Sequence, residues 1–383
     1  MTRKVIYVSY MRLSDKVSRD WYIDYLIENG INVEYWDVVP LLRGEFDEPS
    51  TKATDYLRTF RTYSEVEAML RRSENKDAFF VMLVNYDGHT ARVFRLLSKY
   101  DCRMVFIAWG AMPGGYMRRW RRFVNYLSSP LRLAVNIFNK AKAIAYRKLN
   151  LVKPFDLVFV AGQVLAATNL YAKKVISINL VDYDHYRKIK MKDDRLVEGS
   201  YIVFLDVFLP YHSDYKLAGS QIVKPSEYYA ALNRFFDLLE VKYKIKVVIA
   251  AHPRADYSAE IFNGREIYHG RTPELVKDAD LVIAHHSTAL SYAVLNHKPI
   301  IFAYTNEMAA LYKRSIVSYL YEFSEYLDAA IYNIDEIFQG DQIVIREVNL
   351  KSYDNYKYNY LTTHESENIT TQEIFLREIR QCH

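Results

Sequence analysis

The chain has almost no cysteine. Its 383 residues include only Cys102 and Cys382. Two thiols so far apart make no disulfide framework, so we expect a protein of the reducing cytoplasm. The N-terminus begins a strand-like run at once and has no apolar signal-peptide core. No stretch reaches the roughly 18 apolar residues needed to cross a bilayer, so a membrane-spanning protein is not expected.

Motifs of several enzyme classes are also missing. The first strand is not followed by G-x-G-x-x-G, and no G-x-S-x-G occurs, so neither a dinucleotide fingerprint nor a serine nucleophile is predicted. There is no H-x-x-x-H, and the side chains of His285 and His286, at a strand end, should point in opposite directions. The D-x-D of the second half, at 278–280, precedes its strand. We therefore predict no metal site and no required cofactor.

Positive charge is in mild excess only. The formal net charge of +5 does not indicate a dedicated nucleic-acid binder, and no nucleic-acid partner is predicted. The excess is concentrated in 116–150, which contains no acidic residue and which Pro130 splits into an expected helical hairpin. Two interpretations stay open. The hairpin makes peripheral contact with the anionic inner face of the cytoplasmic membrane, or it packs on its own domain with its basic side chains in water.

Apolar strand-like runs alternate with helix-like segments along most of the chain. The first runs are Lys4–Tyr10 and Ile31–Val38, and a new series begins at Tyr201–Leu205 after a charged segment. Such alternation is typical of parallel sheets covered by helices. We predict an α/β protein of two Rossmann-like domains, 1–190 and 191–383, that face each other across a cleft. The C-terminal helix is expected to pack back on the first domain.

Polar residues collect where two strands of the second half end. One apolar run, Val247–Ala251, leads into His252, and another, Leu281–Ala284, leads shortly into Ser287 and Thr288. We expect the two strands to be neighbours, so that these side chains meet at the sheet edge where α/β proteins bind ligands. An imidazole donates to a phosphate or protonates a leaving group. Hydroxyls at a helix start bind anions or simply cap the helix.

A third turn of the second half has the pattern of a helix start. Thr272 is expected as the N-cap and Pro273 as the first helical residue. The turn either caps its helix and nothing more, or also holds a base or ribose through backbone groups. The residues predicted to bind a nucleotide are His252, Pro253, Arg254, Gly270, Thr272, Glu274, His286, Ser287 and Thr288.

Two aspartates are candidates for a general base. Asp87 follows a buried strand-like run of the first half and precedes Gly88. Asp206 occupies the matching place after the first strand of the second half, near Tyr211 and His212. Either carboxylate is able to deprotonate an acceptor hydroxyl, and the plainer interpretation of Asp87 is a turn residue.

Three short motifs carry a family resemblance. They are Tyr86-Asp87-Gly88, His252-Pro253 and Ser287-Thr288, in this chain order. The set resembles the GT-B glycosyltransferases, and within them the bacterial sialyltransferases that use CMP-activated acidic sugars. In that family the first motif is acidic-acidic-Gly, so Tyr86 is a departure from the pattern. Residues 200–305 also look like capsule and lipopolysaccharide transferases, including Kdo transferases.

The resemblance implies an inverting, metal-independent glycosyltransferase. The first domain would hold the acceptor, a hydroxyl of a bacterial surface glycan or glycolipid. The second would hold the donor, a CMP-activated acidic sugar such as a sialic-type nonulosonate or Kdo. By the same resemblance, Asp87 would be the base and His252 would contact the phosphate and act as the acid. The departure at Tyr86 keeps Asp206 open as the base.

Two alternatives remain at this point. The donor is a UDP- or GDP-sugar, for which Arg254 and Arg271 would supply positive charge near a pyrophosphate. Or the chain is a non-catalytic nucleotide- or glycan-binding protein of a polysaccharide assembly complex, which the altered first motif favours.

Overall fold

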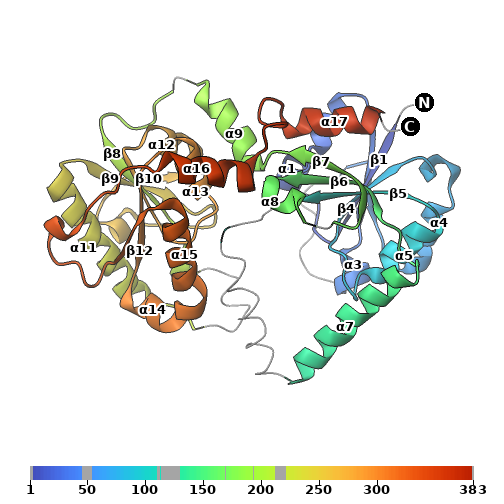
Figure 1. Cartoon of the computed structure of the whole chain (residues 1–383), viewed down its shortest axis with the longest axis horizontal. Coiled ribbons are helices and arrows are strands. Elements are labelled where there is room, and N and C mark those ends of the chain that lie inside the picture. Colours follow the sequence, from blue (N-terminus) through green and yellow to red (C-terminus); the bar gives the residue numbers. More distant parts are fainter. Residues whose placement is uncertain are drawn as a thin grey trace. The chain divides into compact units, whose positions relative to one another are not determined.

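The fold consists of two compact α/β units (Figure 1). The computed structural model describes residues 3–44, 54–109, 113, 130–168, 170–192, 194–211 and 221–381. Of these, unit 1 comprises 3–109, 130–181 and 362–381, and unit 2 comprises 113 and 182–361. His212, Cys382 and the first half of the predicted basic hairpin, 116–129, lie outside the described residues.

Unit 1 is built on a seven-stranded parallel sheet in the order β3-β2-β1-β4-β5-β6-β7. The central strands β1 and β4 are buried along their whole length, which explains their continuous apolar sequences. The strands are β1 Lys4–Ser9, β2 Asn32–Asp37, β3 Leu57–Thr59, β4 Phe79–Leu83, β5 Arg103–Ala108, β6 Phe155–Ala161 and β7 Ala172–Ile178.

Helices cover both faces of this sheet and enclose two apolar cores. The first turn of α1 is capped by Ser14, whose Oγ accepts from the amide of Val17. Tyr22 adopts a left-handed conformation (φ 62°) and divides the helical segment that follows Ser14 into α1 and α2. The helices are α1 Asp15–Asp20, α2 Ile23–Glu28, α3 Val39–Arg43, α4 Tyr63–Leu70, α5 Ala91–Lys99, α7 Pro130–Lys148, α8 Gln163–Ala166 and α17 Thr371–Gln381, with the 3₁₀ turn η1 Ser73–Asn75.

Unit 2 is built on a six-stranded parallel sheet in the order β10-β9-β8-β11-β12-β13. Its strands are β8 Tyr201–Leu205, β9 Lys246–Ala251, β10 Ile267–His269, β11 Leu281–Ala284, β12 Ile300–Tyr304 and β13 Ala330–Asn333. Its helices are α9 Val181–Lys190, α11 Pro225–Tyr243, α12 Thr272–Asp278, α13 Leu290–Leu295, α14 Asn306–Tyr312, α15 Ser318–Leu327 and α16 Leu350–Tyr356. The short 3₁₀ and π turns are η2 Leu209–Tyr211, η3 Ala259–Phe262, η4 Lys313–Val317, η5 Gly340–Gln342 and η6 Lys357–Leu361.

The C-terminal helix α17 returns to unit 1 and lies beside its sheet (Figure 1). Ile374, Phe375 and Ile379 belong to one of the two apolar cores of that unit. Glu378 forms an ion pair of 2.7 Å with Lys174 of β7. The predicted α/β class and the return of this helix are therefore confirmed. The units do not follow the predicted division at 190/191, since the main segment of unit 2 starts at Asp182 and ends at Leu361.

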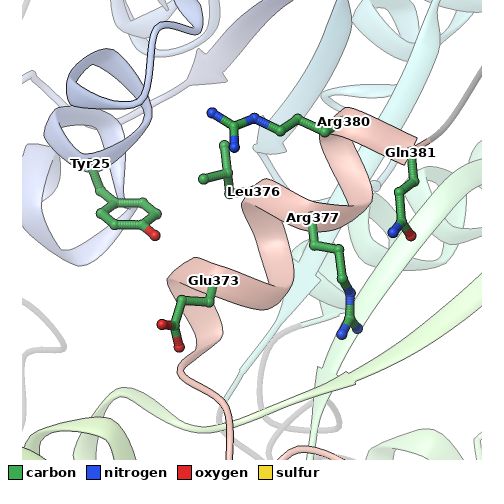
Figure 2. Close-up of a pocket in the computed structure, with 6 residues that line it drawn as sticks. All are labelled: Tyr25, Glu373, Leu376, Arg377, Arg380 and Gln381. Atoms are coloured by element: carbon green, nitrogen blue, oxygen red, sulfur yellow. The ribbon is translucent and has the colours of Figure 1, made fainter.

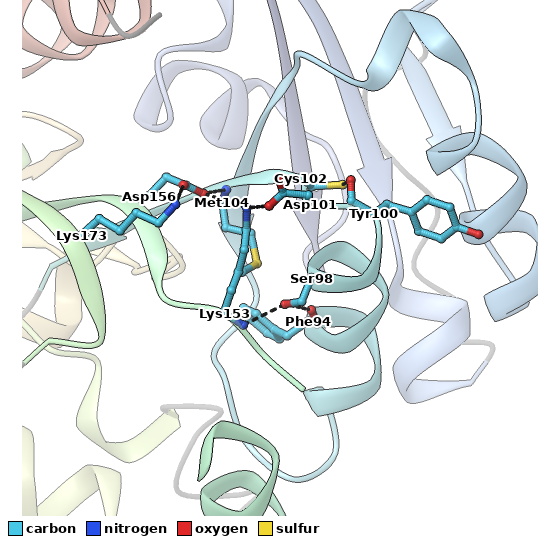
Figure 3. A network of polar contacts seen from close by, with 9 residues as sticks. All are labelled: Phe94, Ser98, Tyr100, Asp101, Cys102, Met104, Lys153, Asp156 and Lys173. Atoms are coloured by element: carbon cyan, nitrogen blue, oxygen red, sulfur yellow. Dashed lines mark hydrogen bonds and ion pairs between the residues drawn. The ribbon is translucent and has the colours of Figure 1, made fainter. Parts of the chain in front are cut away.

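A polar network ties three strands of unit 1 together at the amino end of β6 (Figure 3). Asp156, the second residue of β6, accepts a hydrogen bond of 2.8 Å from the amide of Met104 on β5 and one of 2.7 Å from Lys173 on β7. Lys153 pairs with Asp101 at 2.7 Å and with Asp156 at 3.5 Å. This end of the sheet is opposite the edge where α/β proteins bind ligands, so we assign the network to stability.

The long helix α7 extends away from the body of unit 1 (Figure 1). Three consecutive turns of it expose apolar side chains, with exposed fractions of 51% for Val135, 69% for Phe138 and 47% for Ile144. Among the described residues, no helix combines the length and the apolar character needed to cross a bilayer.

Candidate functional site

Each sheet has one point where the strand order reverses, and some of the predicted residues follow strands at these points. In unit 1 the chain moves outward from β1 in one direction and from β4 in the other, and Asp87 follows β4. In unit 2 the reversal lies between β8 and β11; Asp206 follows β8, and Ser287 and Thr288 come shortly after β11. In open α/β sheets, ligands bind beyond the carboxyl ends of the strands at such a point.

The expectation that β9 and β11 are neighbours is wrong, because β8 pairs with both of them. Neighbouring strands are about 4.8 Å apart, so the ends of β9 and β11 are separated by about 10 Å. The residue at the end of the intervening strand is Asp206. This carboxyl therefore lies between the strand ends that lead to His252 and to Ser287.

Asp206 fixes the end of β8 to the end of β9. It is only 6% exposed. Its oxygens accept hydrogen bonds from the amide of Phe208 (2.9 Å), the amide of His252 (3.1 Å) and the hydroxyl of Tyr257 (2.8 Å). Burial raises the pKa of Asp206 above its ordinary value, although these hydrogen bonds act in the opposite direction. The geometry is that of a group that positions the turn after β9, while its role as a base stays a prediction.

The ring of His252 is held in one orientation by its own turn. Nδ1 accepts a hydrogen bond of 3.2 Å from the amide of Arg254. The neutral ring therefore carries its hydrogen on Nε2, which is the form that donates to a phosphate oxygen. The ring also stacks on Phe208, with 6.1 Å between centroids and 12° between planes. Phe208 itself has a left-handed backbone (φ 52°), and such strain in a non-glycine residue often marks a functional turn.

A local hydrogen bond holds the Ser287-Thr288 turn. Ser287 Oγ accepts a hydrogen bond of 3.2 Å from the amide of Ala289, which leaves its own hydrogen for a ligand. Ser287 and His286 are half-buried and Thr288 is exposed. The helix that follows, α13, has only 6 residues and starts at Leu290 without a side-chain cap. The expected helix start directly at this pair is therefore shifted by two residues.

His285 is a core residue. It is fully buried, its Nδ1 lies 2.5 Å from the carbonyl oxygen of Ala303, and its ring packs edge-on against Phe204. Burial lowers the pKa of His285 to about 4, so the ring is neutral at physiological pH. Its buried Nε2 has no hydrogen-bond partner among the residues that the structure describes. The neighbouring His286 is half-buried, which agrees with alternate directions at a strand end.

The third predicted turn lies at the edge strand β10. Gly270 has a positive φ of 66° and allows the tight turn into α12. The expected N-cap at Thr272 is wrong by one position. Arg271 occupies the cap without a side-chain hydrogen bond, and Thr272 is already helical. Arg271 is exposed and pairs with the half-buried Glu274 at 3.3 Å. Pro253 and Arg254, after β9, are also exposed.

In unit 1 the carboxylate of Asp87 organises its own turn. Oδ1 accepts from the amides of His89 (2.8 Å) and Thr90 (3.0 Å). The side chain is exposed, and Oδ2 accepts no hydrogen bond from any described residue. This geometry agrees with the plainer interpretation, in which Asp87 is a turn residue. It leaves Oδ2 in solvent. The role of Asp87 as a base stays a prediction.

The residues around Asp87 hold α7. Tyr86 donates a hydrogen bond of 2.7 Å to the carbonyl of Ala143, and Nε2 of His89 lies 2.7 Å from the side-chain Nδ2 of Asn139. A Cβ at Gly88 would lie 2.5 Å from the backbone of Asn139, so only glycine fits there. The departure of Tyr86 from the acidic family pattern thus has a structural reason in this chain.

Sequence reasoning missed Phe208 and Tyr257, which hold His252 and Asp206. Both are aromatic residues in irregular turns. The chain contains 34 tyrosines, so the sequence gives no reason to single out one of them. It also gave no weight to Asp182, which contacts Ser291 beyond the Ser287-Thr288 turn. A pair separated by 109 positions has no local signature.

An open pocket of about 300 Å³ lies elsewhere in unit 1, between α2 and α17 (Figure 2). None of the predicted site residues lines it. Arg380 is engaged there, donating a hydrogen bond of 2.8 Å to the carbonyl of Asn29. Its lining residues are Tyr25, Glu373, Leu376, Arg377, Arg380 and Gln381. Within the described part of the chain, no three or more His, Cys, Asp or Glu side chains are grouped so as to hold a metal ion.

No family model matches the sequence, and no curated protein matches it. Solved structures similar to the chain include a glycosyltransferase of kitacinnamycin, with 15% identity, a TM-score of 0.45 and coverage of 99% of this chain and 95% of that one. The UDP-GlcNAc 2-epimerase of Methanocaldococcus jannaschii has 11% identity and a TM-score of 0.48, with full coverage of both chains. The wall teichoic acid polymerase TagF has 10% identity and a TM-score of 0.46, covering 99% and 88%. These likenesses are too distant to assign this chain a donor or an activity.

Proposed function

We propose that this chain is a glycosyltransferase and that unit 2 binds the phosphate of its nucleotide-sugar donor. The supporting observation is the reversal point between β8 and β11, where the Ser287-Thr288 turn comes shortly after β11 and His252 follows β9 on the other side of β8. His252 offers Nε2–H, and Ser287 and Thr288 offer hydroxyl hydrogens. Such fixed donors stabilise the charge that develops on a departing phosphate.

The proposed reaction is a direct displacement with inversion. The acceptor hydroxyl attacks the anomeric carbon, the bond from that carbon to the nucleotide phosphate breaks, and the phosphate leaves as an anion held by His252, Ser287 and Thr288. The acceptor's proton goes to a general base, for which we choose Asp87 because its Oδ2 accepts no hydrogen bond within the described chain. Asp206, with three hydrogen bonds already, is the second choice.

For the donor we place a UDP- or GDP-sugar first. A pyrophosphate carries more charge than a monophosphate, and two exposed arginines, Arg254 and Arg271, lie just after β9 and β10. A CMP-activated acidic sugar is the second candidate, supported by the order of the three motifs. The acceptor is proposed to be a hydroxyl of a bacterial surface glycan or glycolipid.

Ligand-induced thermal stabilisation distinguishes these donors. We expect UDP or GDP to raise the Tm more than CMP or CDP. Stabilisation by CMP alone would support the acidic-sugar donor, and the absence of any shift would favour a non-catalytic glycan-binding protein. Ser287→Ala should weaken nucleotide binding roughly fivefold, the effect of one hydrogen bond. The exposed Ser258→Ala is the matched control and should bind as the wild type does.

Two further substitutions separate the base from the positioning group. Asp87→Asn should remove sugar transfer and leave nucleotide affinity unchanged. Asp206→Asn should weaken nucleotide affinity, because the carboxyl holds the amide of His252. The reverse pattern, with transfer lost only in Asp206→Asn at unchanged affinity, would assign the base to Asp206.

We also propose that α7 contacts an anionic membrane surface, where a glycolipid acceptor would be found. Its side chains from 134 to 148 include four basic residues and no acidic one, namely Lys140, Lys142, Arg147 and Lys148. Val135, Ile137 and Phe138 are each more than half exposed. A helix with exposed apolar side chains and basic charge is suited to the lipid headgroup region.

A further inference from the structure

A buried polar contact lies directly beyond the Ser287-Thr288 turn. Ser291, the second residue of α13, is only 1% exposed. Its Oγ lies 2.7 Å from the carbonyl oxygen of Thr288 and also within hydrogen-bond distance of Oδ2 of Asp182. Asp182 is the second residue of α9, so this contact joins two helices of unit 2.

The contact brings two acceptor oxygens to one hydroxyl. A serine hydroxyl has a single hydrogen to donate. Two hydrogen bonds need two hydrogens. A carbonyl oxygen carries none, so only the carboxyl of Asp182 is able to supply the second hydrogen. With that proton in place, the carboxyl donates to Ser291 Oγ, and Ser291 donates to the Thr288 carbonyl. Without it, an ionised carboxylate and a carbonyl compete for one hydrogen.

Among the described residues, no lysine or arginine pairs with Asp182. The titratable groups that face it are His185 on α9, Tyr292 on α13, and the fully buried Tyr356 on α16. The hydroxyl of Tyr292 lies 3.4 Å from Oδ1 of Asp182 and 3.4 Å from Nδ1 of His185. Burial raises the pKa of Asp182 above its ordinary value, although Ser291, Tyr292 and His185 act in the opposite direction.

The Thr288 carbonyl is the part of the turn that this chain of bonds fixes. It also accepts the amide of Ser291 at 3.3 Å, a longer and weaker bond than that from the hydroxyl. When the carbonyl is fixed, the peptide plane between Thr288 and Ala289 is fixed, and so is the amide that binds Ser287 Oγ. The direction of the Ser287 hydroxyl therefore depends on the contact with Asp182.

We propose that Asp182 is a positioning residue that holds a proton at neutral pH and, through Ser291, locks the turn that grips the donor phosphate. The part of this inference that concerns the phosphate rests on the proposed function. Loss of the proton breaks the chain of hydrogen bonds and loosens the turn, so donor binding weakens as the pH rises.

Protein stability tests the proton without any nucleotide. The folded state binds the proton of Asp182 more tightly than the unfolded chain does. This contribution to stability is complete below the ordinary pKa and is lost as the pH rises through the raised pKa. Asp182→Asn, whose amide donates as the protonated acid does, should lack this loss. The wild type should therefore lose Tm relative to Asp182→Asn as the pH is raised, and equal pH profiles would overturn the proposal.

Infrared difference spectra give a direct readout at neutral pH. The wild type minus Asp182→Asn should show the C=O stretch of a protonated carboxylic acid, and the band of a carboxylate instead would overturn the proposal. A protonated Asp206 contributes equally to both proteins and cancels. If Asp182→Asn does not fold, a carboxyl ¹³C titration of Asp206→Asn labelled at aspartate answers the same question, because Asp182 must titrate above the usual aspartate range and Asp206, whose pKa burial also raises, is absent.

Nucleotide affinity tests the link to the turn. Ser291→Ala should weaken binding of UDP roughly fivefold, while Asp182→Asn should bind as tightly as the wild type at neutral pH and show no decline at higher pH. Ser324→Ala removes another buried helical hydroxyl of unit 2, which donates to a backbone carbonyl at 2.9 Å, and should leave affinity unchanged. If Ser291→Ala binds UDP as tightly as the wild type does, Asp182 does not position the turn through Ser291. If the wild type binds no nucleotide at all, the proposed function fails, and the two preceding experiments still decide whether Asp182 holds a proton.

Discussion

Asp206 illustrates how a strand-end carboxyl acts through its neighbours. Its hydrogen bonds from the amides of Phe208 and His252 join the turns after β8 and β9. The stacking of Phe208 on His252 completes this arrangement. Asp206 and Phe208 lie in the turn after β8 and His252 lies in the turn after β9, so their association arises from the adjacency of β8 and β9 in the sheet.

Because His285 is buried, the free energy of unfolding should fall as the pH becomes acidic. Its pKa is lowered to about 4 by burial, so the folded chain binds this proton less tightly than the unfolded chain. The resulting stability is complete above the ordinary value near 6.5 and is lost as the pH falls from there toward 4. Between pH 8 and pH 5 the free energy of unfolding should fall by about 2 kcal/mol on this account.

His285→Asn is the comparison for this effect, because its amide can still donate to the Ala303 carbonyl. Urea unfolding of both proteins at pH 8 and pH 5 measures the difference. The wild type should lose about 2 kcal/mol more than the variant over this range. Contributions from Asp182 and Asp206 are common to both and cancel, so parallel pH profiles would contradict the assignment.

At the scale of elements, the turn after β4 packs against α7 and holds it. Tyr86, Gly88 and His89 all contact this helix, while Asp87 caps the turn itself. Cation–π contact of Arg147 with Tyr86, 4.3 Å from the ring centroid, adds to the attachment. The part of α7 from 134 to 138, including Val135 and Phe138, is exposed. The helix therefore has an anchored end and an exposed end.

The exposed end of α7 predicts binding to anionic vesicles. In flotation assays the chain should rise with vesicles rich in phosphatidylglycerol, less so at high salt, and not with pure phosphatidylcholine. Replacing Ile137 and Phe138 by Glu should abolish flotation, because each apolar side chain contributes roughly 1.5–3 kcal/mol when buried. Val241→Glu on α11, where the side chain is 79% exposed, is the matched control. Absence of the wild type from both kinds of vesicle would remove the membrane role.

At the scale of the molecule, the chain crosses from unit 1 to unit 2 and back. The return places α17 in the core of unit 1, with Ile379 fully buried. The stability of unit 1 therefore depends on the last residues of the chain. Apart from Pro113, the described residues of unit 2 all fall within 182–361.

Ile379→Ala should destabilise unit 1 by about 2–5 kcal/mol, the cost of a core cavity. Tryptophan fluorescence reports this, because three of the four tryptophans of the chain, Trp21, Trp36 and Trp109, lie in unit 1. The fluorescence transition should move to lower denaturant concentration, and the exposed Arg377→Ala should leave it in place. An unchanged fluorescence transition in Ile379→Ala would show that unit 1 does not depend on α17.

The sequence by itself determined the class of the fold and the location of the strand ends. Runs such as Ala78–Val84 are apolar throughout because a central parallel strand is buried on both faces, and polar residues such as His252 and Ser287 follow where that burial stops. These are local patterns, and a single sequence contains them in full.

Tertiary structure decided which of these ends meet. It put β8 between β9 and β11, tied Asp206 to His252, brought Asp182 to Ser291 and returned α17 to unit 1. It also showed that Tyr86 and Gly88 serve the packing of α7. Each of these pairings joins residues far apart in the chain, and their free energy comes from burial and hydrogen bonds made only after folding, so no local pattern in the sequence announces them.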